Sequence, residues 1–375
     1  MATLFEETVI NGMRLSNRVA RSATWEGMCG PDGRPSEKLA AFYGNLARGG
    51  VGLIITGYAF VRPDGKQLPG KMGFHTDDFA KDALRITRAV HDAGGKIAVQ
   101  LVHAGGQTDS KTAGGRTLAP SAVETVQYPE TPGALSIPEI RDIAAAFGAG
   151  ARRAREWEFD AVQLHGAHGY LINQFLSPHT NLREDDYGGG IEGRSRFLME
   201  VYDAVRKEAG HDFPAMIKLT AGDHLEGGLE IEEALFAAGR LSDAGIDAIE
   251  VSTGTMASGD KTPARKKINA PEKEAYNLDA ARRVREVAAC PVMSVGGFRS
   301  YDVCEDAVSS GAVDYVAMSR PLIREPDMPG RWMKGDRRPA ACISCNGCFG
   351  PGLEEGGIYC VVEKKEREKE KAPGA

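Results

Sequence analysis

Long apolar runs and an excess of basic residues are both missing from this sequence. No stretch of its 375 residues approaches the roughly 18 consecutive apolar residues of a membrane span. Lysine and arginine number 46 against 52 aspartate and glutamate, a net charge of −6 that offers no positive stripe for nucleic acid or a membrane surface. The segment Met1–Glu7 also lacks the basic and apolar regions of a secretory signal. We therefore expect a cytoplasmic protein that binds neither nucleic acid nor membranes.

Cysteine is scarce and unevenly placed. Of the seven cysteines, Cys29, Cys290 and Cys304 are scattered, and we expect these three to serve only in packing. The other four fall between residues 342 and 360. In a chain without an export signal, such clustering favours metal or redox chemistry over disulfides.

A glycine-rich phosphate turn is missing as well. The segment Ser22–Gly27, which follows the first expected strand, has no Gly-x-Gly-x-x-Gly pattern, and this disfavours a doubly wound open sheet. Short β-branched runs alternate instead with amphipathic stretches, several of which begin at capping residues and end at glycine. The expected strands are 18–22, 52–56, 96–101, 160–164, 215–219, 247–251, 291–295 and 314–318. The expected helices are 36–48, 78–94, 139–157, 193–209, 231–244, 279–289 and 301–310.

This alternation predicts an α/β fold, a (β/α)8 barrel with a short cysteine-rich extension. We expect the barrel over residues 1–335, the extension over 336–362 and a charged tail over 363–375. The tail is a dense run of glutamate and lysine, so it should be a solvated helix end or a disordered segment. The glycine-, threonine- and proline-rich stretch 102–137 should form a lid or a substrate-binding loop.

Two histidines and a tyrosine follow the fourth expected strand. His165, His168 and Tyr170 stand at i, i+3 and i+5 with glycines between them. Imidazoles can polarise a carbonyl oxygen and a phenol can deliver a proton, all from one short loop. In a parallel barrel, the carboxyl ends of all strands face one side, where the active site forms. We therefore expect these three residues to be catalytic.

The last two expected strands end in residues suited to phosphate. Gly296 and Gly297 lead directly into a helix, and Ser319 with Arg320 follows the eighth strand. Backbone N–H groups at a helix N-terminus bind phosphate, and an arginine adds a charge-assisted hydrogen bond. Barrels commonly hold a phosphate between these two loops. A phosphorylated cofactor or substrate is therefore expected.

Together these motifs resemble the Old Yellow Enzyme family of FMN-dependent NAD(P)H oxidoreductases over residues 1–335. The resemblance rests on Asn17-Arg18-Val, Gln100-Leu-Val-His-Ala-Gly, the segment from His165 to Ser177-Pro, Asp186-Tyr187-Gly-Gly, Arg194-Ser-Arg196-Phe, and the glycine and Ser-Arg pairs. It implies a (β/α)8 barrel with FMN at the carboxyl ends of its strands, NAD(P)H as reductant and an enone-type substrate. We also expect a homo-oligomer.

The resemblance further implies roles for individual residues. His165 and His168 would bind the carbonyl oxygen of an α,β-unsaturated substrate, and Tyr170 would protonate its α-carbon after hydride transfer from the flavin. Lys218 would place a positive charge beside the flavin pyrimidine, to which Gln100 would hydrogen-bond. The other flavin contacts would come from Ser22, Ala23, Thr24, Thr56, Gly57, Gly296, Gly297, Ser319 and Arg320.

Two positions depart from the family pattern. Many members have arginine where Lys218 stands, and lysine keeps the charge but loses the bidentate fork. Many also have threonine or cysteine where Trp25 stands, so flavin potential and pocket shape should differ here, with Trp25 on the substrate side. Trp25 removes the usual cysteine attachment point and Cys29 lies too far along, so we expect non-covalent FMN.

The clustered cysteines have the spacing of a metal centre. Cys342, Cys345 and Cys348 recur every three residues, and Cys360 follows after a gap of eleven. All-sulfur ligation suits either an iron–sulfur cluster or zinc. Larger relatives of the dienoyl-CoA reductase and trimethylamine dehydrogenase type carry a similar motif that holds a [4Fe–4S] cluster, followed by a nucleotide-binding domain. The resemblance thus implies a [4Fe–4S] cluster, with zinc as the alternative, and we expect no nucleotide-binding domain in this chain.

Three functions stay open at this point. The leading one is an FMN-dependent reductase of activated C=C bonds, fed by NAD(P)H. An amine-type dehydrogenase would run in the opposite direction and pass electrons through the cluster to an electron-transfer protein. A non-redox aldolase or isomerase would bind a sugar phosphate, with Lys218 as Schiff-base nucleophile.

Overall fold

Eight parallel strands close into a barrel in the computed structural model, which describes residues 2–371. The strands are β3 (Val19–Arg21), β4 (Leu53–Ile55), β6 (Ile97–Val102), β9 (Ala161–Gly166), β10 (Ala215–Thr220), β11 (Ala248–Ser252), β12 (Val292–Val295) and β13 (Tyr315–Met318). They pair in chain order, and β13 pairs with β3 to close the ring. The short β5 (Ala59–Phe60) adds to the end of β6. The predicted (β/α)8 fold is therefore confirmed.

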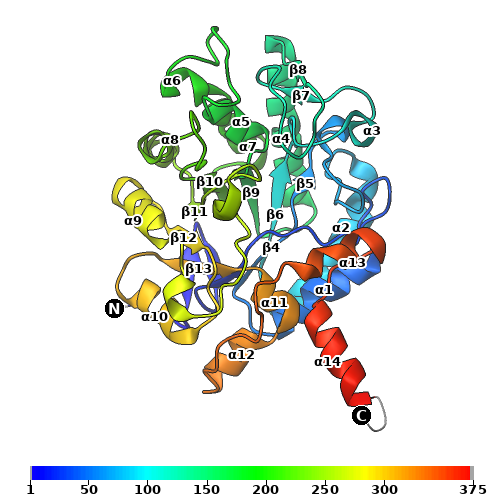
Figure 1. Ribbon diagram of the computed structural model, residues 1–375, viewed down its shortest axis with the longest axis vertical. Coiled ribbons are helices and arrows are strands. Elements are labelled where there is room, and N and C mark those ends of the chain that lie inside the picture. The colour runs from blue at the N-terminus through cyan, green and yellow to red at the C-terminus, as the bar shows by residue number, and fades with distance from the viewer. Residues whose placement is uncertain (1, 372–375) are drawn as a thin grey trace.

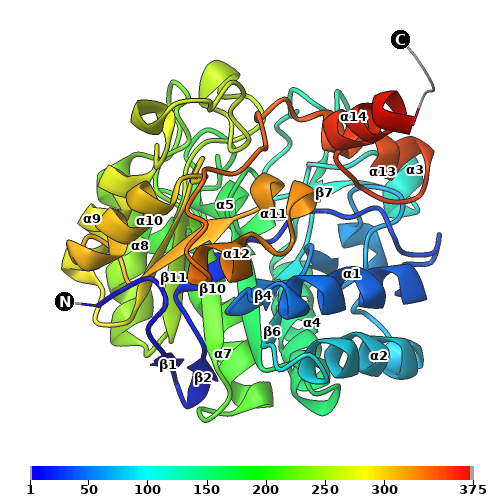
Figure 2. The same ribbon diagram turned by 90° about the horizontal axis from the view of Figure 1, so that it is seen from below.

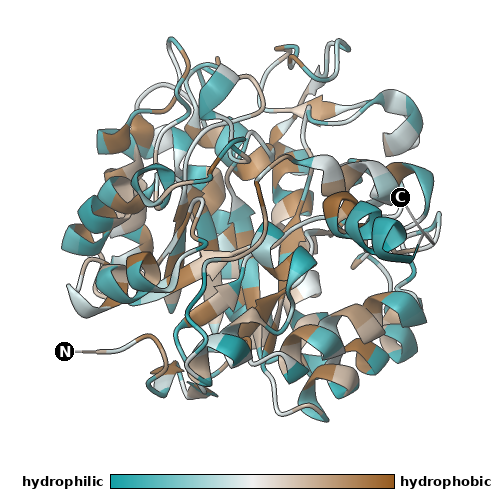
Figure 3. Ribbon diagram, turned by 60° about the horizontal axis from the view of Figure 1, so that its bottom comes forward, coloured by the Kyte–Doolittle hydropathy of each residue, from teal (hydrophilic) through white to brown (hydrophobic). Residues whose placement is uncertain are grey.

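Helices cover the outside of the barrel (Figure 1). The main ones are α1 (Glu37–Arg48), α2 (Ala80–His91), α4 (Ile137–Glu156), α7 (Arg196–Ala209), α8 (Ile231–Asp243), α9 (Leu278–Val287) and α10 (Tyr301–Ser309). In α4, buried Ile140, Ile143 and Phe147 recur at helical spacing, and Ser136 with Glu139 forms a capping box. Hydrophilic residues gather on the outer sides of the helices (Figure 3). No helix within residues 2–371 is long and apolar enough to cross a membrane.

The amino-terminal end of the barrel is plugged by a hairpin that the sequence did not indicate. Strands β1 (Thr8–Ile10) and β2 (Met13–Leu15) pair antiparallel, and Ile10 packs with Met216, Met293 and other small and apolar side chains of the barrel interior. Thr8 also hydrogen-bonds to the hydroxyl of Tyr315 at 3.0 Å. Figure 2 shows this hairpin and the C-terminal helices on opposite sides of the molecule. The hairpin leaves only the carboxyl ends of the strands open for a site.

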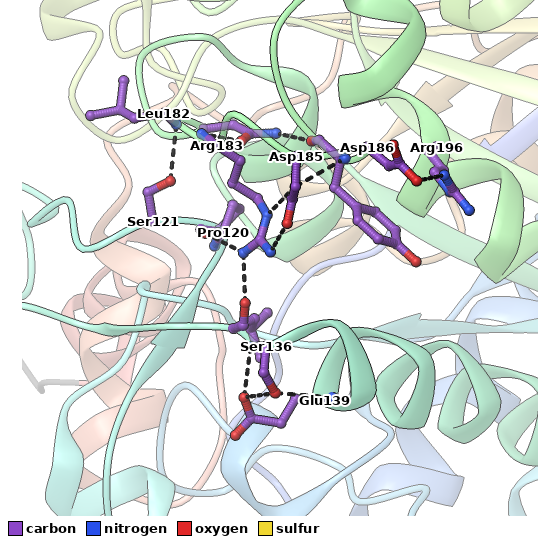
Figure 4. A network of polar contacts seen from close by, with 12 residues as sticks. Pro120, Ser121, Ser136, Glu139, Leu182, Arg183, Asp185, Asp186 and Arg196 are labelled. Atoms are coloured by element: carbon purple, nitrogen blue, oxygen red, sulfur yellow. Dashed lines mark hydrogen bonds and ion pairs between the residues drawn. The ribbon is translucent and has the colours of Figure 1, made fainter.

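The loop between β6 and α4 forms a small substructure of its own. It contains α3 (Ser110–Ala113), β7 (Leu118–Ala119) and β8 (Gly133–Ala134), and the two strands pair parallel. Arg183 holds it down by donating to the carbonyl oxygens of Pro120 and Leu135, at 2.9 and 2.6 Å, while it pairs with Asp185 (Figure 4). The loop that was predicted to be a lid is therefore held mainly by one half-buried guanidinium.

After the barrel, the chain turns back across its carboxyl face. The elements there are α11 (Arg320–Arg324), α12 (Met328–Met333), η5 (Gly347–Phe349), α13 (Gly350–Glu354) and α14 (Val361–Lys371). The charged tail is a solvated helix as far as Lys371: α14 buries no side chain and is tied to α11 by the Arg324–Glu366 pair. The remaining four residues of the predicted tail lie outside the described residues.

Candidate active site

A cavity of about 480 Å³ opens at the carboxyl ends of the barrel strands. Most of the predicted site residues line it: Ser22, Ala23, Thr24, Trp25, His165, His168, Tyr170, Lys218, Gly297, Ser319 and Arg320. Gln127 and Tyr128 of the predicted lid also line it. The volume lies within the range of small-molecule and cofactor pockets, which run from about 300 to 1,000 Å³.

Four residues that were predicted to contact the flavin do not line the cavity. Thr56, Gly57, Gln100 and Gly296 are not among the lining residues. The hydroxyl of Thr56 accepts from the backbone N–H of Gln100 at 3.2 Å, and the N–H of Gly57 donates to Glu26 at 3.0 Å. Their polar groups therefore shape the layer beneath the cavity.

That layer is a buried chain of polar side chains. Gln100 donates to Gln163 at 2.7 Å, and Gln163 donates to Glu250 at 2.9 Å. Glu250 accepts from Ser22 at 2.6 Å and pairs with Lys218 at 3.1 Å. Burial lowers the pKa of Lys218, and the charge of Glu250 opposes that shift. The predicted positive charge thus reaches the cavity already paired with a carboxylate.

Strand register explains why these side chains meet. Lys218 is opposite His165 on one neighbouring strand and opposite Glu250 on the other, and Gln100 is opposite Gln163. Sequence reasoning missed Gln163 and Glu250. A signal was present, because Gln163 stands two residues before His165 and therefore points to the same face of its strand.

His165 and His168 are packed against one another with ring centroids 5.3 Å apart. His168 has a φ of +62° and its Nε2 lies 2.8 Å from the hydroxyl of Ser252, while Nδ1 of His165 accepts from the N–H of Ala167 at 3.3 Å. Burial lowers the pKa of both rings, and the charge of Lys218 adds to this effect. Both imidazoles are therefore neutral near pH 7, and a neutral imidazole keeps one N–H to donate.

Tyr170 lies directly against this pair, with its ring centroid 4.6 Å from that of His165. Its hydroxyl donates to Gln67 Oε1 at 2.8 Å. Burial raises the pKa of Tyr170, so the phenol is protonated at neutral pH and can act as a proton donor. Gln67 and its neighbour Tyr58, which also line the cavity, were not predicted from the sequence.

At the predicted phosphate end, part of the donor set is already in use. The N–H groups of Arg299 and Ser300, at the start of α10, both donate to Glu274, at 2.8 and 2.9 Å. Arg320 donates to the carbonyl oxygen of Arg265 and to Asn346, at 2.7 and 2.6 Å. Gly297, with φ +78°, keeps the backbone open on the cavity side. A phosphate here would rest on Gly297, Ser319 and the arginine side chains more than on the helix N-terminus.

The residues present fit FMN. Gln100 Oε1 and Arg299 Nε are buried without a hydrogen-bond partner in the described part of the chain. The first is an acceptor that would be available to a ring N–H of the cofactor, and the second belongs to an arginine that lines the cavity. Ser22, Ala23 and Thr24 also line the cavity. The cavity therefore matches a flat heterocycle with a phosphate at one end.

The C-terminal extension builds part of the same cavity, which the sequence did not reveal. Ser344, Asn346, Phe349 and Leu353 all line it. A Cβ added at Gly352 would lie 2.8 Å from the Trp25 ring, so glycine lets α13 lie directly on that indole. Trp25 itself donates to the carbonyl oxygen of Pro69 at 3.2 Å and lines the cavity.

The clustered cysteines line a second, much smaller hollow of about 20 Å³ beside the first. Its walls include Cys342, Cys345, Cys348 and Cys360, together with Arg320, which lines both hollows. Within residues 2–371, no three His, Cys, Asp or Glu side chains converge closely enough to hold a single metal ion. The scattered Cys29, Cys290 and Cys304 are free thiols elsewhere in the fold.

Fold and site together define a flavin oxidoreductase barrel of the Old Yellow Enzyme type. Residues 3–338 match the NADH:flavin oxidoreductase / NADH oxidase family, and the chain belongs to this family. The family resemblance predicted from the motifs is thereby confirmed. The non-redox aldolase or isomerase alternative, with Lys218 as nucleophile, is wrong for a member of this family.

Individual relatives place the chain more finely. It is 35% identical over 351 residues to an NADH oxidase of Thermoanaerobacter brockii, covering 92% of this chain and 53% of that protein. It is 34% identical over 327 residues to an NADPH dehydrogenase of a Geobacillus species, strain WCH70, covering 87% and 92%. The solved structure of 2-naphthoyl-CoA reductase with 2-naphthoyl-CoA has a TM-score of 0.88 at 25% identity, covering 96% of this chain and 56% of that one. The chain thus spans about half the length of some relatives and nearly all of others.

Proposed function

We propose that this protein uses FMN and NAD(P)H to reduce activated C=C bonds of α,β-unsaturated carbonyl compounds. One observation carries the proposal. Two neutral imidazoles, His165 and His168, and the protonated phenol of Tyr170 reach the same cavity from one short loop. A C=C bond conjugated to a carbonyl needs this combination, because charge develops on the oxygen while a carbon accepts a proton.

The roles of the side chains follow from their positions. FMN, reduced by NAD(P)H, would supply the hydride. His165 and His168 would donate hydrogen bonds to the carbonyl oxygen of the substrate. Tyr170 would give its hydroxyl proton to the α-carbon, and water would return a proton to the phenol. Trp25 and Tyr128 would close the cavity around the apolar part of the substrate.

The test separates proton delivery from electron transfer. Tyr170→Phe should slow re-oxidation of the reduced protein by 2-cyclohexenone by about 10²-fold or more, because only the alkene needs a proton on carbon. Re-oxidation by oxygen should change little. Tyr202→Phe is the matched control: this tyrosine is also buried, but its hydroxyl bonds to the carbonyl oxygen of Ala244 outside the cavity. Equal slowing with both oxidants, or none, in stopped-flow traces would remove Tyr170 from the mechanism.

We further propose that Cys342, Cys345, Cys348 and Cys360 bind a [4Fe–4S] cluster. All four line one hollow, and Arg320 links that hollow to the flavin cavity. Zinc–sulfur bonds of about 2.3 Å in a tetrahedron need thiolates only about 3.8 Å apart. A [4Fe–4S] cluster is larger and takes four thiolates that stand further apart, and the spacing of these four cysteines resembles the motif that holds such a cluster in larger relatives. A cluster here would give electrons an exit to an electron-transfer protein, as an amine-type dehydrogenase requires.

Elemental analysis decides between the two centres. Protein made and purified without oxygen should contain about four iron and four acid-labile sulfide per chain. Cys345→Ser should lose both and keep FMN, whereas Cys29→Ser, at a cysteine that does not line the hollow, should keep all three. One zinc per chain without labile sulfide would make the extension a structural clip and end the electron-exit proposal.

A further inference from the structure

A buried lysine stands directly behind the substrate wall of the cavity. Lys71 lies in the segment that follows η1 (Pro63–Gly65), and its side chain is almost completely buried at 1% exposure. Within residues 2–371 it forms no ion pair. Glu26, the carboxylate that bears most on its charge, is already paired with Arg21 at 2.7 Å. An unpaired buried cation is costly, so its position requires a physical reason.

The backbone fixes this lysine from two sides. The N–H of Phe60 donates to Met72 at 3.0 Å, and the N–H of Cys29 donates to Gly70 at 3.1 Å. Gly70 has a φ of +65°, and an added Cβ would meet the backbone of Gly27 at 3.0 Å. The segment around Lys71 is therefore held against the barrel mouth and has little freedom to move the ammonium elsewhere.

The ammonium joins a cluster of donors around a single oxygen. Lys71 Nζ donates to Gln67 Oε1 at 2.9 Å, and the hydroxyls of Tyr58 and Tyr170 donate to the same oxygen, each at 2.8 Å. An amide oxygen has two lone pairs, so three donors compete for it. The Tyr170 hydroxyl is thereby held in place without being fully committed to Gln67, and it stays available to a substrate in the cavity.

The ammonium of Lys71 also lies close enough to Tyr170 to interact with a negative charge on its oxygen. Its nitrogen is 3.1 Å from the ring centroid of Tyr58 and 5.5 Å from that of Tyr170. Tyr58 and Tyr170 are in turn 5.2 Å apart. When a proton leaves Tyr170, the oxygen becomes negative in a site that burial makes unfavourable for charge, and a nearby cation offsets that cost. The neighbouring His165 is neutral and cannot do so.

We propose that Lys71 is a positioning residue for proton delivery: acting through Gln67, it holds the Tyr170 hydroxyl toward the substrate and stabilises the oxygen as its proton leaves. The inference rests on the proposed reduction of activated C=C bonds. In that step the Tyr170 O–H bond breaks, a C–H bond forms at the α-carbon, and the hydride comes from the reduced cofactor. Water then returns the proton to Tyr170. Lys71 gains and loses nothing, because it only balances charge.

The charge of Lys71 depends on the groups around it. Burial lowers the pKa of the Lys71 ammonium, and Glu26 opposes this shift. A negative charge on Tyr170 would favour the charged form of the ammonium as Glu26 does, so the two charges would stabilise one another as the proton leaves.

The experiment compares two oxidants in the wild-type protein and four variants. Lys71→Met keeps the length of the side chain and removes its charge. It should slow re-oxidation by 2-cyclohexenone by about tenfold or more, toward the loss expected for Tyr170→Phe, while re-oxidation by oxygen stays within about twofold. Lys71→Arg keeps charge and donors and should recover most of the rate. In the double variant with Tyr170→Phe, Lys71→Met should add less than about twofold, since residues that act as one unit are not additive.

Control variants distinguish a failure of the Lys71 proposal from a failure of the proposed function. Lys66→Met removes a charge of the same sign from the same segment, where its ammonium contacts the carbonyl oxygen of Pro31, and should leave both rates unchanged. If Lys71→Met does not fold, Gln67→Met tests the same connection and should give the same enone-specific loss. Two results would overturn the role of Lys71 while leaving the proposed function standing. In both, the wild-type enzyme reduces the enone; in the first, Lys71→Met reduces it equally fast, and in the second, the losses of Lys71→Met and Tyr170→Phe add in the double variant. Wild-type enzyme that never transfers hydride to the enone would overturn the proposed function and this inference with it.

Discussion

Replacing Arg183 by methionine should loosen the lid loop and leave the barrel intact. The guanidinium holds the carbonyl oxygens of Pro120 and Leu135, the residues that directly follow β7 and β8 (Figure 4). One side chain thus ties the carboxyl ends of both lid strands to the segment after α5 (Leu171–Leu176). Methionine preserves most of the apolar stem and removes every donor.

The magnitude follows from the burial of each bond. Hydrogen bonds from a charged group contribute about 1.5–3 kcal/mol each, so the two carbonyl contacts together contribute about 3–6 kcal/mol. The pair with Asp185 adds at most about 1 kcal/mol, because that carboxylate is 36% exposed. Taking the lower figure, local opening should become easier by about 3 kcal/mol, which corresponds to roughly 100-fold faster exchange of protected amides.

Amide hydrogen exchange measures this directly. The N–H groups of Gly133 and Leu135 donate across the lid to Thr117 and Ala119, each at 2.9 Å, and report its opening. Arg196→Met is the control, since its partners Asp186 and Glu200 lie outside the lid strands. Because Tyr128 lines the cavity from this loop, the KM for the enone should rise as well. Unchanged exchange at Gly133 and Leu135 in a folded Arg183→Met protein would refute the pinning role.

Three other changes have expected outcomes. His165→Ala and His168→Ala should each lower enone turnover by about 10²–10³-fold while flavin reduction by NAD(P)H stays partly intact, which separate half-reaction rates would measure. Gly57→Ala should destabilise the fold by about 1–3 kcal/mol in denaturant titrations, because its Cβ would lie 2.1 Å from Glu26 Oε2; Gly239→Ala, in open space on α8, should not. The folded pKa values of His165 and His168 are lowered, so the unfolded chain binds more protons below about pH 6.5 and stability should fall as pH falls. His165→Asn should flatten that slope, and a stability independent of pH between 7.5 and 5 in the wild type would contradict it.

Each barrel strand could be predicted because its signal is local. A buried β-branched run such as Asp247–Val251 needs only its neighbours in sequence to indicate a strand, and β11 occupies most of it. Capping residues and terminal glycines marked the helices in the same way. The hairpin β1–β2 and the short β7 and β8 have two or three residues each, so pairing and packing form them, not propensity. Such elements were not visible in the sequence.

The site residues likewise divide into those that local sequence predicts and those that only the folded structure brings in. His165, Lys218 and Ser319 were predicted because they end strands, and strand ends of a barrel converge by geometry alone. Gln67 and Lys71 arrive through a segment that folds back over the strands, held by the hydrogen bond between Phe60 and Met72. No periodicity or motif in the sequence predicts that this segment packs against the cavity.

The close approach of α13 to Trp25 has a practical consequence for anyone who shortens this enzyme. The family match ends at residue 338, and a truncation there would look like a clean domain cut. It would remove Phe349 and Leu353 from the cavity wall, expose the Trp25 indole, and free Arg320 from Asn346. The trimmed barrel would keep every predicted catalytic residue and have a wider, wetter mouth. The catalytic unit, measured by which atoms enclose the substrate, is therefore longer than the family domain.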